Sequence, residues 1–361
     1  MSAPTPSPHV PAGYQYVWGD EFDGDGIDQQ KWAYQGWGQG AIPYEKRQMV
    51  DPATDSKHIR VEDSVLHLTS VAEADGTVSG PRALQTTGGR FAFKYGYLEM
   101  RANISFTNGK WPALWGRSIA KTTDRREWRY FSELDFLEAV TWLDNDYLGT
   151  WNPNVQKWYE PSDGKTNAAW EGSYTPQQAL TAGESKWAVY GFLWTPTLLR
   201  VSVDGVALKS YDLTRNYDRA GKHTTLLGNR DPHYLILNGY GAGGGAGKAG
   251  DMQVDYVRVY QRANEGAIYR TLYEPHAASA TLSEDPNEAD WLNYTRLWHA
   301  TREGFTLAGW NTKPDGTGRM LQPGWRHNPP PGTTTLHAIW QPETPTDETS
   351  AGETPTADTT D

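Results

Sequence analysis

Short strand-like runs separated by turn signals fill residues 13–261, and they constrain the fold more than any other feature of the chain. Apolar and polar residues alternate in residues 59–69, 96–104 and 199–204, as they do in half-buried strands. Asp204 and Gly205 separate two such runs and predict a hairpin turn. Because no long segment has the helical period, the pattern predicts an all-β fold, either a sandwich or a barrel of antiparallel strands.

Composition divides the 361 residues into four parts. Residues 1–12 are rich in Pro and Ser and predict a linker, and residues 13–262 hold the main series of strands. Residues 263–341 form a second unit with further strand-like runs. Residues 342–361 carry six acidic residues, seven Thr and no basic residue. They predict a disordered acidic tail, because they cannot bury enough apolar surface to offset the entropy of ordering.

The net charge of −11 argues against nucleic acid or an anionic membrane as the main partner. The chain has no Cys, which excludes disulfides and a thiol nucleophile. No apolar run approaches the roughly 18 residues of a membrane span, so no membrane insertion is expected. Residues 1–8 lack the basic and apolar parts of a signal peptide. The protein is therefore either cytoplasmic or exported by a signal that is not part of this sequence.

Three carboxylates, those of Glu133, Asp135 and Glu138, stand within a short and otherwise apolar segment. Carboxylates are costly to desolvate and repel one another, so an apolar strand gains no stability from them. We therefore expect acid/base or nucleophilic chemistry at this place. A calcium site and a solvent-facing acidic strand are the alternatives, and calcium would need further oxygen ligands close by.

The spacing of these carboxylates predicts an irregular strand. Glu133 and Asp135 are two residues apart and share a face, whereas Glu138 would point the other way in a regular strand. One extra residue, a β-bulge, returns Glu138 to the face of the other two. Leu134 and one of the next two apolar residues then turn into the core.

Two carboxylates that face one cleft are the usual apparatus for cutting glycosidic bonds. At a separation of about 5 Å, one attacks the anomeric carbon and the other protonates the leaving oxygen. A third carboxylate between them can hold the nucleophile and separate the two proton affinities. The 17 Trp and 20 Tyr of the chain suit sugar rings in a wet cleft, with aromatic packing in a β-rich core as the alternative.

Residues 133–138 resemble the ExDxxE signature of glycoside hydrolase family 16 in its bulged form. This resemblance covers residues 13–262 and implies a concanavalin A-like jelly-roll sandwich with a concave cleft for an extended glycan. The supporting segments follow the order of the family: residues 18–23, 28–32, 87–90, 95–101, 109–115, 189–194, 203–205, 234–238 and 254–260.

The resemblance also implies roles for the three carboxylates. Glu133 corresponds to the nucleophile, Glu138 to the acid/base and Asp135 to the helper between them. The expected activity is that of a retaining endo-β-glycanase that hydrolyses β-linked polysaccharide by double displacement and needs no cofactor for catalysis. A transglycosylase that uses the same residues and a non-catalytic glycan-binding surface protein are the alternatives.

Five further positions are implied to contact the substrate. Trp111 and Trp115 correspond to sugar platforms, with core packing as the alternative for each. Arg90 and Glu45 resemble polar residues that line the cleft near the cleavage point, and each could instead form a surface ion pair. Trp151 stands where many bulged members carry His.

Two more departures concern the substrate. Laminarin-cleaving members usually have Asn where this chain has Tyr44, and Gly where this chain has Ser132. Relatives that cleave agarose and other galactans often lack that Gly. The resemblance therefore implies β-1,3-glucan of the laminarin type as substrate, with a β-galactan as the alternative.

Many members of the family bind one structural calcium ion away from the chemistry. Glu21 and Asp255 correspond to its side-chain ligands, and Ser64 stands where a Gly carbonyl is usual. Oxygen ligands suit calcium. The alternative is that Glu21 and Asp255 are ordinary carboxylates at strand ends.

Residues 301–340 of the second unit resemble the Listeria–Bacteroides repeat, which is also known from internalin B. The resemblance implies a small β-grasp-like module of secreted and surface proteins, with Trp310 and Trp340 in its core because so small a unit needs large residues. The implied protein is a secreted or cell-surface monomer of bacterial origin, with attachment to the cell wall through its C-terminal region. A surface adhesin whose repeat carries the function is the alternative.

Overall fold

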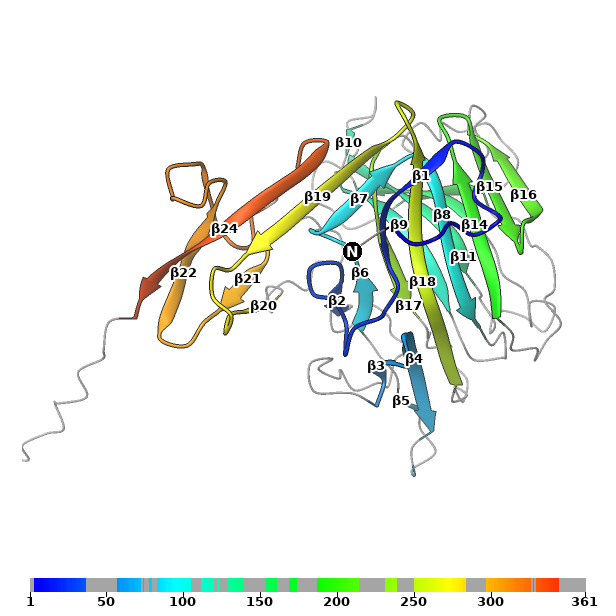
Figure 1. Ribbon diagram of the computed structural model, residues 1–361. Coiled ribbons are helices and arrows are strands. Elements are labelled where there is room, and N and C mark those ends of the chain that lie inside the picture. Colours follow the sequence, from blue (N-terminus) through cyan, green and yellow to red (C-terminus); the bar gives the residue numbers. More distant parts are fainter. Residues whose placement is uncertain are drawn as a thin grey trace, which may run out of the picture.

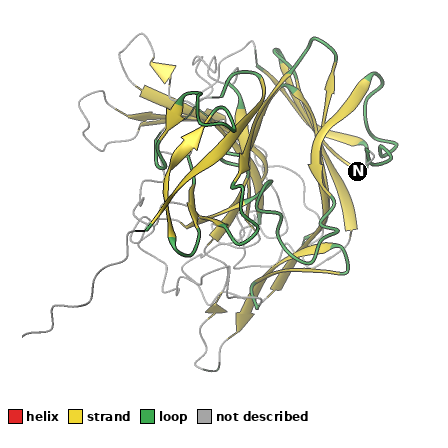
Figure 2. Ribbon diagram, turned by 60° about the vertical axis from the view of Figure 1, so that its left-hand side comes forward, coloured by secondary structure: helices red, strands yellow, loops and turns green. Residues whose placement is uncertain are grey.

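The computed structural model describes most of the chain, and every regular element in the described part is a strand (Figure 2). The all-β prediction is thereby confirmed. No described segment is a helix of the length and hydrophobicity that a membrane crossing requires. The described residues are 3–36, 57–72, 74, 78–79, 83–104, 112–119, 122–123, 129–138, 154–160, 169–173, 187–213, 231–238, 250–283, 297–325, 327 and 329–343.

Two large sheets carry the described strands (Figure 1). The first has nine described strands in the order β16-β15-β14-β8-β18-β4-β3, with β1 also paired to β18 and β5 to β4. Its strands are β1 (Tyr14–Asp20), β3 (Ile59–Glu62), β4 (Val65–Ala72), β5 (Val78–Ser79), β8 (Gly96–Asn103), β14 (Trp187–Trp194), β15 (Leu198–Val203), β16 (Val206–Asp212) and β18 (Gly250–Arg262).

The second sheet has thirteen described strands and runs β13-β12-β11-β9-β17-β7-β19-β24-β22-β23 along its main path. Its strands are β2 (Ala33–Gly36), β6 (Ala83–Thr86), β7 (Phe91–Lys94), β9 (Ala113–Ser118), β10 (Thr122–Thr123), β11 (Arg129–Glu138), β12 (Asn154–Glu160), β13 (Ala169–Ser173), β17 (His233–Asn238), β19 (Ala267–Glu274), β22 (Phe305–Asn311), β23 (Met320–Leu321) and β24 (Gly332–Pro342). A separate pair joins β20 (Thr281–Ser283) to β21 (His299–Thr301).

The inner faces of the two sheets pack against each other around one hydrophobic core. Leu98 and Met100 of β8 enter it from the nine-stranded sheet, and Leu114 of β9 enters it from the thirteen-stranded sheet. The rings of Phe136 and Phe192 lie 5.3 Å apart and join β11 to β14 across this core. The predicted sandwich is therefore present, because alternate residues of both sheets bury their apolar side chains between them.

Turn residues shape the hairpins much as the sequence predicts. Asp204 and Gly205 have φ angles of 47° and 79° and link β15 to β16, so both central residues of this turn are left-handed. Asp63 and Ser64 also have positive φ angles, 51° and 58°. They divide residues 59–69, which read as one run, into the two strands β3 and β4.

The second unit continues the sheet of the sandwich (Figure 1). Strand β19 follows β18 closely along the chain and pairs antiparallel with β7, while β24 pairs parallel with β19 on its other side. The unit also has a core of its own, which contains Trp310 and has Trp340 packed against it, as predicted. It is thus joined to the sandwich by a backbone ladder as well as by the chain connection.

Residues 3–12, which the composition predicts to be a linker, lie against the nine-stranded sheet. The Thr5 and Ala12 carbonyl oxygens accept hydrogen bonds from Arg258 and Arg262 of β18, at 3.3 and 3.4 Å. The Ser7 hydroxyl donates to the buried Glu99 carboxylate of β8 at 2.5 Å. This segment therefore covers part of the outer face of the sandwich.

Candidate active site

Strand β11 carries the three carboxylates and contains the predicted bulge. Its pairing with β9 places Asp135 opposite Trp115 and Leu137 opposite Leu114, so that one residue of β11 is extra at this point. Phe136 and Leu137 are both fully buried in the sandwich core. The bulge therefore sends two consecutive apolar residues inward, where the spacing predicted only one of them.

The bulge brings all three carboxylates to the same face of the sheet. Register partners share a face, and β9 supplies them at every second position: Arg117 for Glu133, Trp115 for Asp135 and Ala113 for Glu138. We call this side of the thirteen-stranded sheet, opposite the sandwich core, the carboxylate face. Glu133 and Asp135 are 8% and 4% exposed, and Glu138 is half-buried.

Strand β17 pairs with β9 on the side away from β11. It continues the cross-strand rows of paired residues that share the carboxylate face. Tyr234 pairs with Arg117, Ile236 with Trp115 and Asn238 with Ala113. The row that begins at Glu133 therefore crosses Arg117 and reaches Tyr234. Any ligand that lies across the strands at Glu133 meets the side chains of β9 and β17 in succession.

Trp115 belongs to a small apolar cluster on the carboxylate face, separate from the core of the sandwich. Its indole Nε1 donates a hydrogen bond to the Asn238 Oδ1 at 2.9 Å, which fixes the ring plane. The side chain is 8% exposed and packs with Tyr234 and Ile236. Trp115 thus lies on the same face as the carboxylates, as a sugar platform requires, although most of its surface is covered.

Arg117 also lies on the carboxylate face and was not predicted from the sequence to do so. It lies directly opposite Glu133, is 2% exposed, and places its guanidinium carbon 5.9 Å from the centre of the Trp115 ring. The signal was present in the sequence, because Arg117 is two residues after Trp115 and must share its face in any strand.

The structure places Arg90 at the junction with the second unit, three strands away from β11 in the sheet order. Its guanidinium carbon is 3.4 Å from the centre of the Trp298 ring and 4.4 Å from that of Tyr273, and its Nε donates to the Gln29 carbonyl at 2.8 Å. The side chain is 1% exposed and therefore lies inside the junction, not at the surface. A substrate contact by Arg90 stays a prediction.

Several predicted positions lie outside the described residues. They are the sugar platforms Trp111 and Trp151, the cleft residue Glu45 and its neighbour Tyr44. Ser132 lies in β11, opposite Lys157 of β12. The contacts of these residues with substrate therefore remain predictions.

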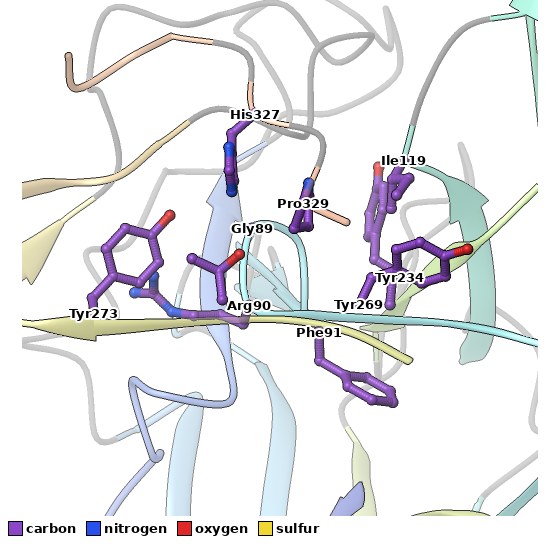
Figure 3. Close-up of a pocket in the computed structure, with 11 residues that line it drawn as sticks. Gly89, Arg90, Phe91, Ile119, Tyr234, Tyr269, Tyr273, His327 and Pro329 are labelled. Carbon is purple, nitrogen blue, oxygen red and sulfur yellow. The ribbon is translucent and has the colours of Figure 1, made fainter. Parts of the chain in front are cut away.

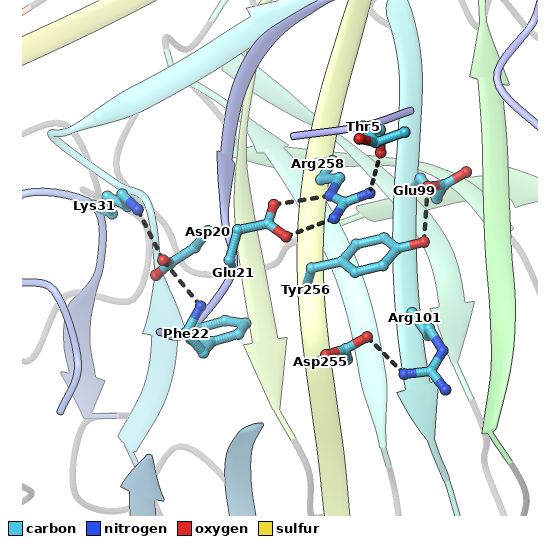
Figure 4. Close-up of polar contacts among 10 residues, drawn as sticks. All are labelled: Thr5, Asp20, Glu21, Phe22, Lys31, Glu99, Arg101, Asp255, Tyr256 and Arg258. Carbon is cyan, nitrogen blue, oxygen red and sulfur yellow. Dashed lines mark hydrogen bonds and ion pairs between the residues drawn. The ribbon is translucent and has the colours of Figure 1, made fainter. Parts of the chain in front are cut away.

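Two of the candidate calcium ligands lie at the nine-stranded sheet, Glu21 directly after β1 and Asp255 in β18 (Figure 4). Both oxygens of Glu21 accept hydrogen bonds from Arg258, at 2.8 and 2.5 Å, and Asp255 accepts one from Arg101 at 2.6 Å. Ser64 lies in the exposed turn between β3 and β4. The described part of the chain contains no cluster of three or more acidic or imidazole groups that would suit a metal. In this arrangement arginines pair with the carboxylates of Glu21 and Asp255, and a calcium ion at these residues stays a prediction.

The sequence model of the glycosyl hydrolases family 16 matches residues 46–258 of the chain. The glucan endo-1,3-beta-glucosidase A1 of Niallia circulans is 27% identical over 72% of this chain, and the match covers 40% of that protein. The keratan-sulfate endo-1,4-beta-galactosidase of Sphingobacterium multivorum is 29% identical over 69% of this chain and 55% of its own length. This chain thus spans about half the length of these two relatives.

A solved structure with a similar fold is that of LamAcat from Zobellia galactanivorans. It superposes with a TM-score of 0.50 and 22% identity over 69% of this chain and 99% of that one. At this identity the likeness concerns the fold alone, and it agrees with the sandwich described above.

Proposed function

Since the chain belongs to the glycosyl hydrolases family 16, we propose that it is a retaining endo-β-glycanase. The observation that carries the proposal is the bulge of β11, which presents Glu133, Asp135 and Glu138 on one face of one sheet. A strand that served only packing would gain nothing from three carboxylates on a largely covered face.

The proposed reaction has two steps that share the same residues. Glu133 attacks the anomeric carbon and forms a glycosyl ester, while Glu138 gives its proton to the leaving sugar oxygen. Glu138 then takes a proton from water, whose oxygen attacks the anomeric carbon and releases Glu133. Asp135, between them on the same face, helps to hold the nucleophile, and Arg117 pairs with Glu133 across the neighbouring strand β9.

For the substrate we propose β-1,3-glucan of the laminarin type, in keeping with the endo-1,3-beta-glucosidase among the relatives. A β-galactan is the second candidate. Its support is Ser132, which replaces a Gly that galactan-cleaving relatives often lack, and the endo-1,4-beta-galactosidase among the relatives. Tyr44 also departs from the laminarin-cleaving pattern, and Trp151 departs from the His of many bulged members.

Product analysis on laminarin, mixed-linkage glucan, agarose and arabinogalactan tests the substrate. We expect internal cleavage of laminarin, with a ladder of short oligosaccharides and retention of the anomeric configuration. Cleavage of agarose or arabinogalactan alone would show that the substrate is a β-galactan. Absence of cleavage on all four would contradict the enzymatic proposal. Products longer than the substrate chain would identify a transglycosylase.

The second unit is proposed to be a module of the Listeria–Bacteroides repeat type on a secreted or cell-surface monomer. Its support is the pattern of residues 301–340 and the packing of Trp310 and Trp340 around one small core. Attachment to the cell wall through the C-terminal region is tested by co-sedimentation of the full chain with bacterial cell walls, and the monomer by light scattering. Full recovery in the supernatant would contradict attachment.

A structural calcium ion at Glu21, Ser64 and Asp255 remains a prediction. Its binding would require Arg258 and Arg101 to give up their carboxylates. Calorimetric melting in calcium chloride and in EDTA tests it, because a ligand of the folded state raises the melting temperature. Equal melting temperatures in the two buffers would exclude the ion.

A further inference from the structure

A pocket lies on the carboxylate face where the sandwich meets the second unit (Figure 3). It is a small, partly open depression whose space runs into open solvent. Tyr234 lines it and is also the end of the row that crosses from Glu133 through Arg117. The pocket is therefore on the same side of the same sheet as the three carboxylates.

Both units build this pocket. Tyr234 and Arg90 come from the sandwich, and Tyr269 lies on β19, opposite Ala92 of β7. His327 and Pro329 come from the segment between β23 and β24 and project toward the strand that begins at Phe91 (Figure 3). Neither unit would form the pocket without the other.

The lining of the pocket suits a neutral sugar. Tyr269, Ile119 and Pro329 are half-buried and supply aromatic and apolar surface, against which the C–H faces of sugar rings pack. His327 is half-buried, and its Nε2 is covered and has no hydrogen-bond partner in the described part of the chain.

The protonation of His327 agrees with a neutral ligand. Burial, and then the charge of Arg319, lowers the pKa of His327 below its usual value, so the ring is neutral at neutral pH. A neutral imidazole offers one nitrogen that accepts and one that donates, which matches the two roles of a hydroxyl group.

The pocket lies at a distance from the three carboxylates that suits sugar residues away from the cleavage point. In the sheet order β11-β9-β17-β7-β19, Tyr234 is two strands and Tyr269 four strands from Glu133. At a spacing of about 4.8 Å per strand, these positions lie about 10 and 19 Å from the nucleophile strand. A glycan chain that crosses the strands at the carboxylates would reach the pocket a few sugar residues further on.

We propose that this junction pocket is an outer subsite, in which the second unit helps to bind the substrate chain beyond the sugars at the cleavage point. The proposal rests on the glycanase function proposed above. It gives the second unit a part in substrate binding, in addition to any part in attachment.

Kinetics on a long and a short substrate test the subsite. For Tyr269→Ala and His327→Ala in the full chain, we expect KM on laminarin to rise about tenfold, while kcat/KM on laminaritriose, which is too short to span both places, stays unchanged. Agarose and a short agaro-oligosaccharide replace them if the product panel selects a galactan. Tyr269→Phe keeps the ring and should retain the wild-type KM, and so should Val206→Ala on the exposed β15–β16 hairpin.

Two outcomes would overturn the subsite. One is a wild-type KM on the polymer for both alanine variants. The other is an equal loss of kcat/KM on the long and the short substrate. Such a loss would show that the residues support the fold or act at the cleavage point. If the wild type cleaves neither glycan, affinity electrophoresis in gels that contain laminarin or agarose decides the matter. Retardation of the wild type that both alanine variants lose would support the subsite, and equal migration would refute it.

Discussion

Glu99 of β8 is a buried carboxylate on the outer face of the nine-stranded sheet, and three hydroxyl groups satisfy it. Tyr256 donates to one oxygen at 2.9 Å, while Ser7 and Tyr97 donate to the other at 2.5 and 3.4 Å. Burial, and then the charge of Glu99, raises the pKa of both tyrosines, so their hydroxyls keep their protons and donate. Ser7 thus ties the N-terminal segment to a fully covered charge.

Replacement of Ser7 should therefore destabilise the sandwich. In Ser7→Ala the Glu99 carboxylate loses a donor, and we expect the free energy of unfolding to fall by about 1–3 kcal/mol. Urea unfolding followed by tryptophan fluorescence measures the change. Thr5→Ala is the matched control, because Thr5 is exposed and bonds Arg258 through its backbone carbonyl. Equal midpoints for Ser7→Ala and the wild type would show that the hydrogen bond from Ser7 to Glu99 does not contribute to stability.

The bulge of β11 is the element on which the site depends. Deletion of Leu137 would remove the extra residue, and regular alternation would still keep all three carboxylates on one face. We expect this variant to fold, to lose about 2–5 kcal/mol of stability with the buried leucine, and to retain measurable cleavage. Insertion of one Ala between Leu137 and Glu138 should turn Glu138 toward the core and abolish cleavage.

Circular dichroism and cleavage assays on the two variants check this prediction together. A folded deletion variant without activity, beside an active insertion variant, would contradict the account of the bulge.

Elements with a local signal could be predicted from the sequence. The carboxylate spacing predicts the bulge, and Asp204–Gly205 predicts the turn that joins β15 to β16. Partners that depend on distant segments could not be predicted. Nothing local to Arg90 indicates that Tyr273 and Trp298 of the second unit enclose it. The spacing likewise does not show which of Phe136 and Leu137 turns inward, and the structure buries both of them in the core.

At the scale of the whole molecule, the second unit is part of the sandwich sheet. Strand β19 pairs with the edge of β7, and the Gln30 side chain bonds the backbone of Tyr273 at 2.8 and 3.3 Å. Tyr273 in turn contacts Trp310 in the core of the second unit, with ring centres 4.8 Å apart. The two units should therefore unfold together rather than as independent domains.

A chain that ends at Arg262 should be much less stable than the full chain. It would leave the edge of β7 without its partner strand and would remove the rings that cover Arg90. We expect insolubility, or a fall of about 10 °C or more in the melting temperature on the scale of about 2–4 °C per kcal/mol. A chain that ends at Glu343 is the control and should melt like the full chain. A stable sandwich from the shorter chain would show that the ladder between β7 and β19 is dispensable.

The central claim is that Glu133, presented by the bulged strand, is the nucleophile of a glycanase. The most direct test measures kcat of Glu133→Gln on the glycan that the wild type cleaves, with Glu62→Gln on the exposed end of β3 as the control. We predict a loss of at least about 10³-fold for Glu133→Gln, with retained glycan binding and fold, and no loss for Glu62→Gln. Cleavage by Glu133→Gln at the wild-type rate would contradict the account.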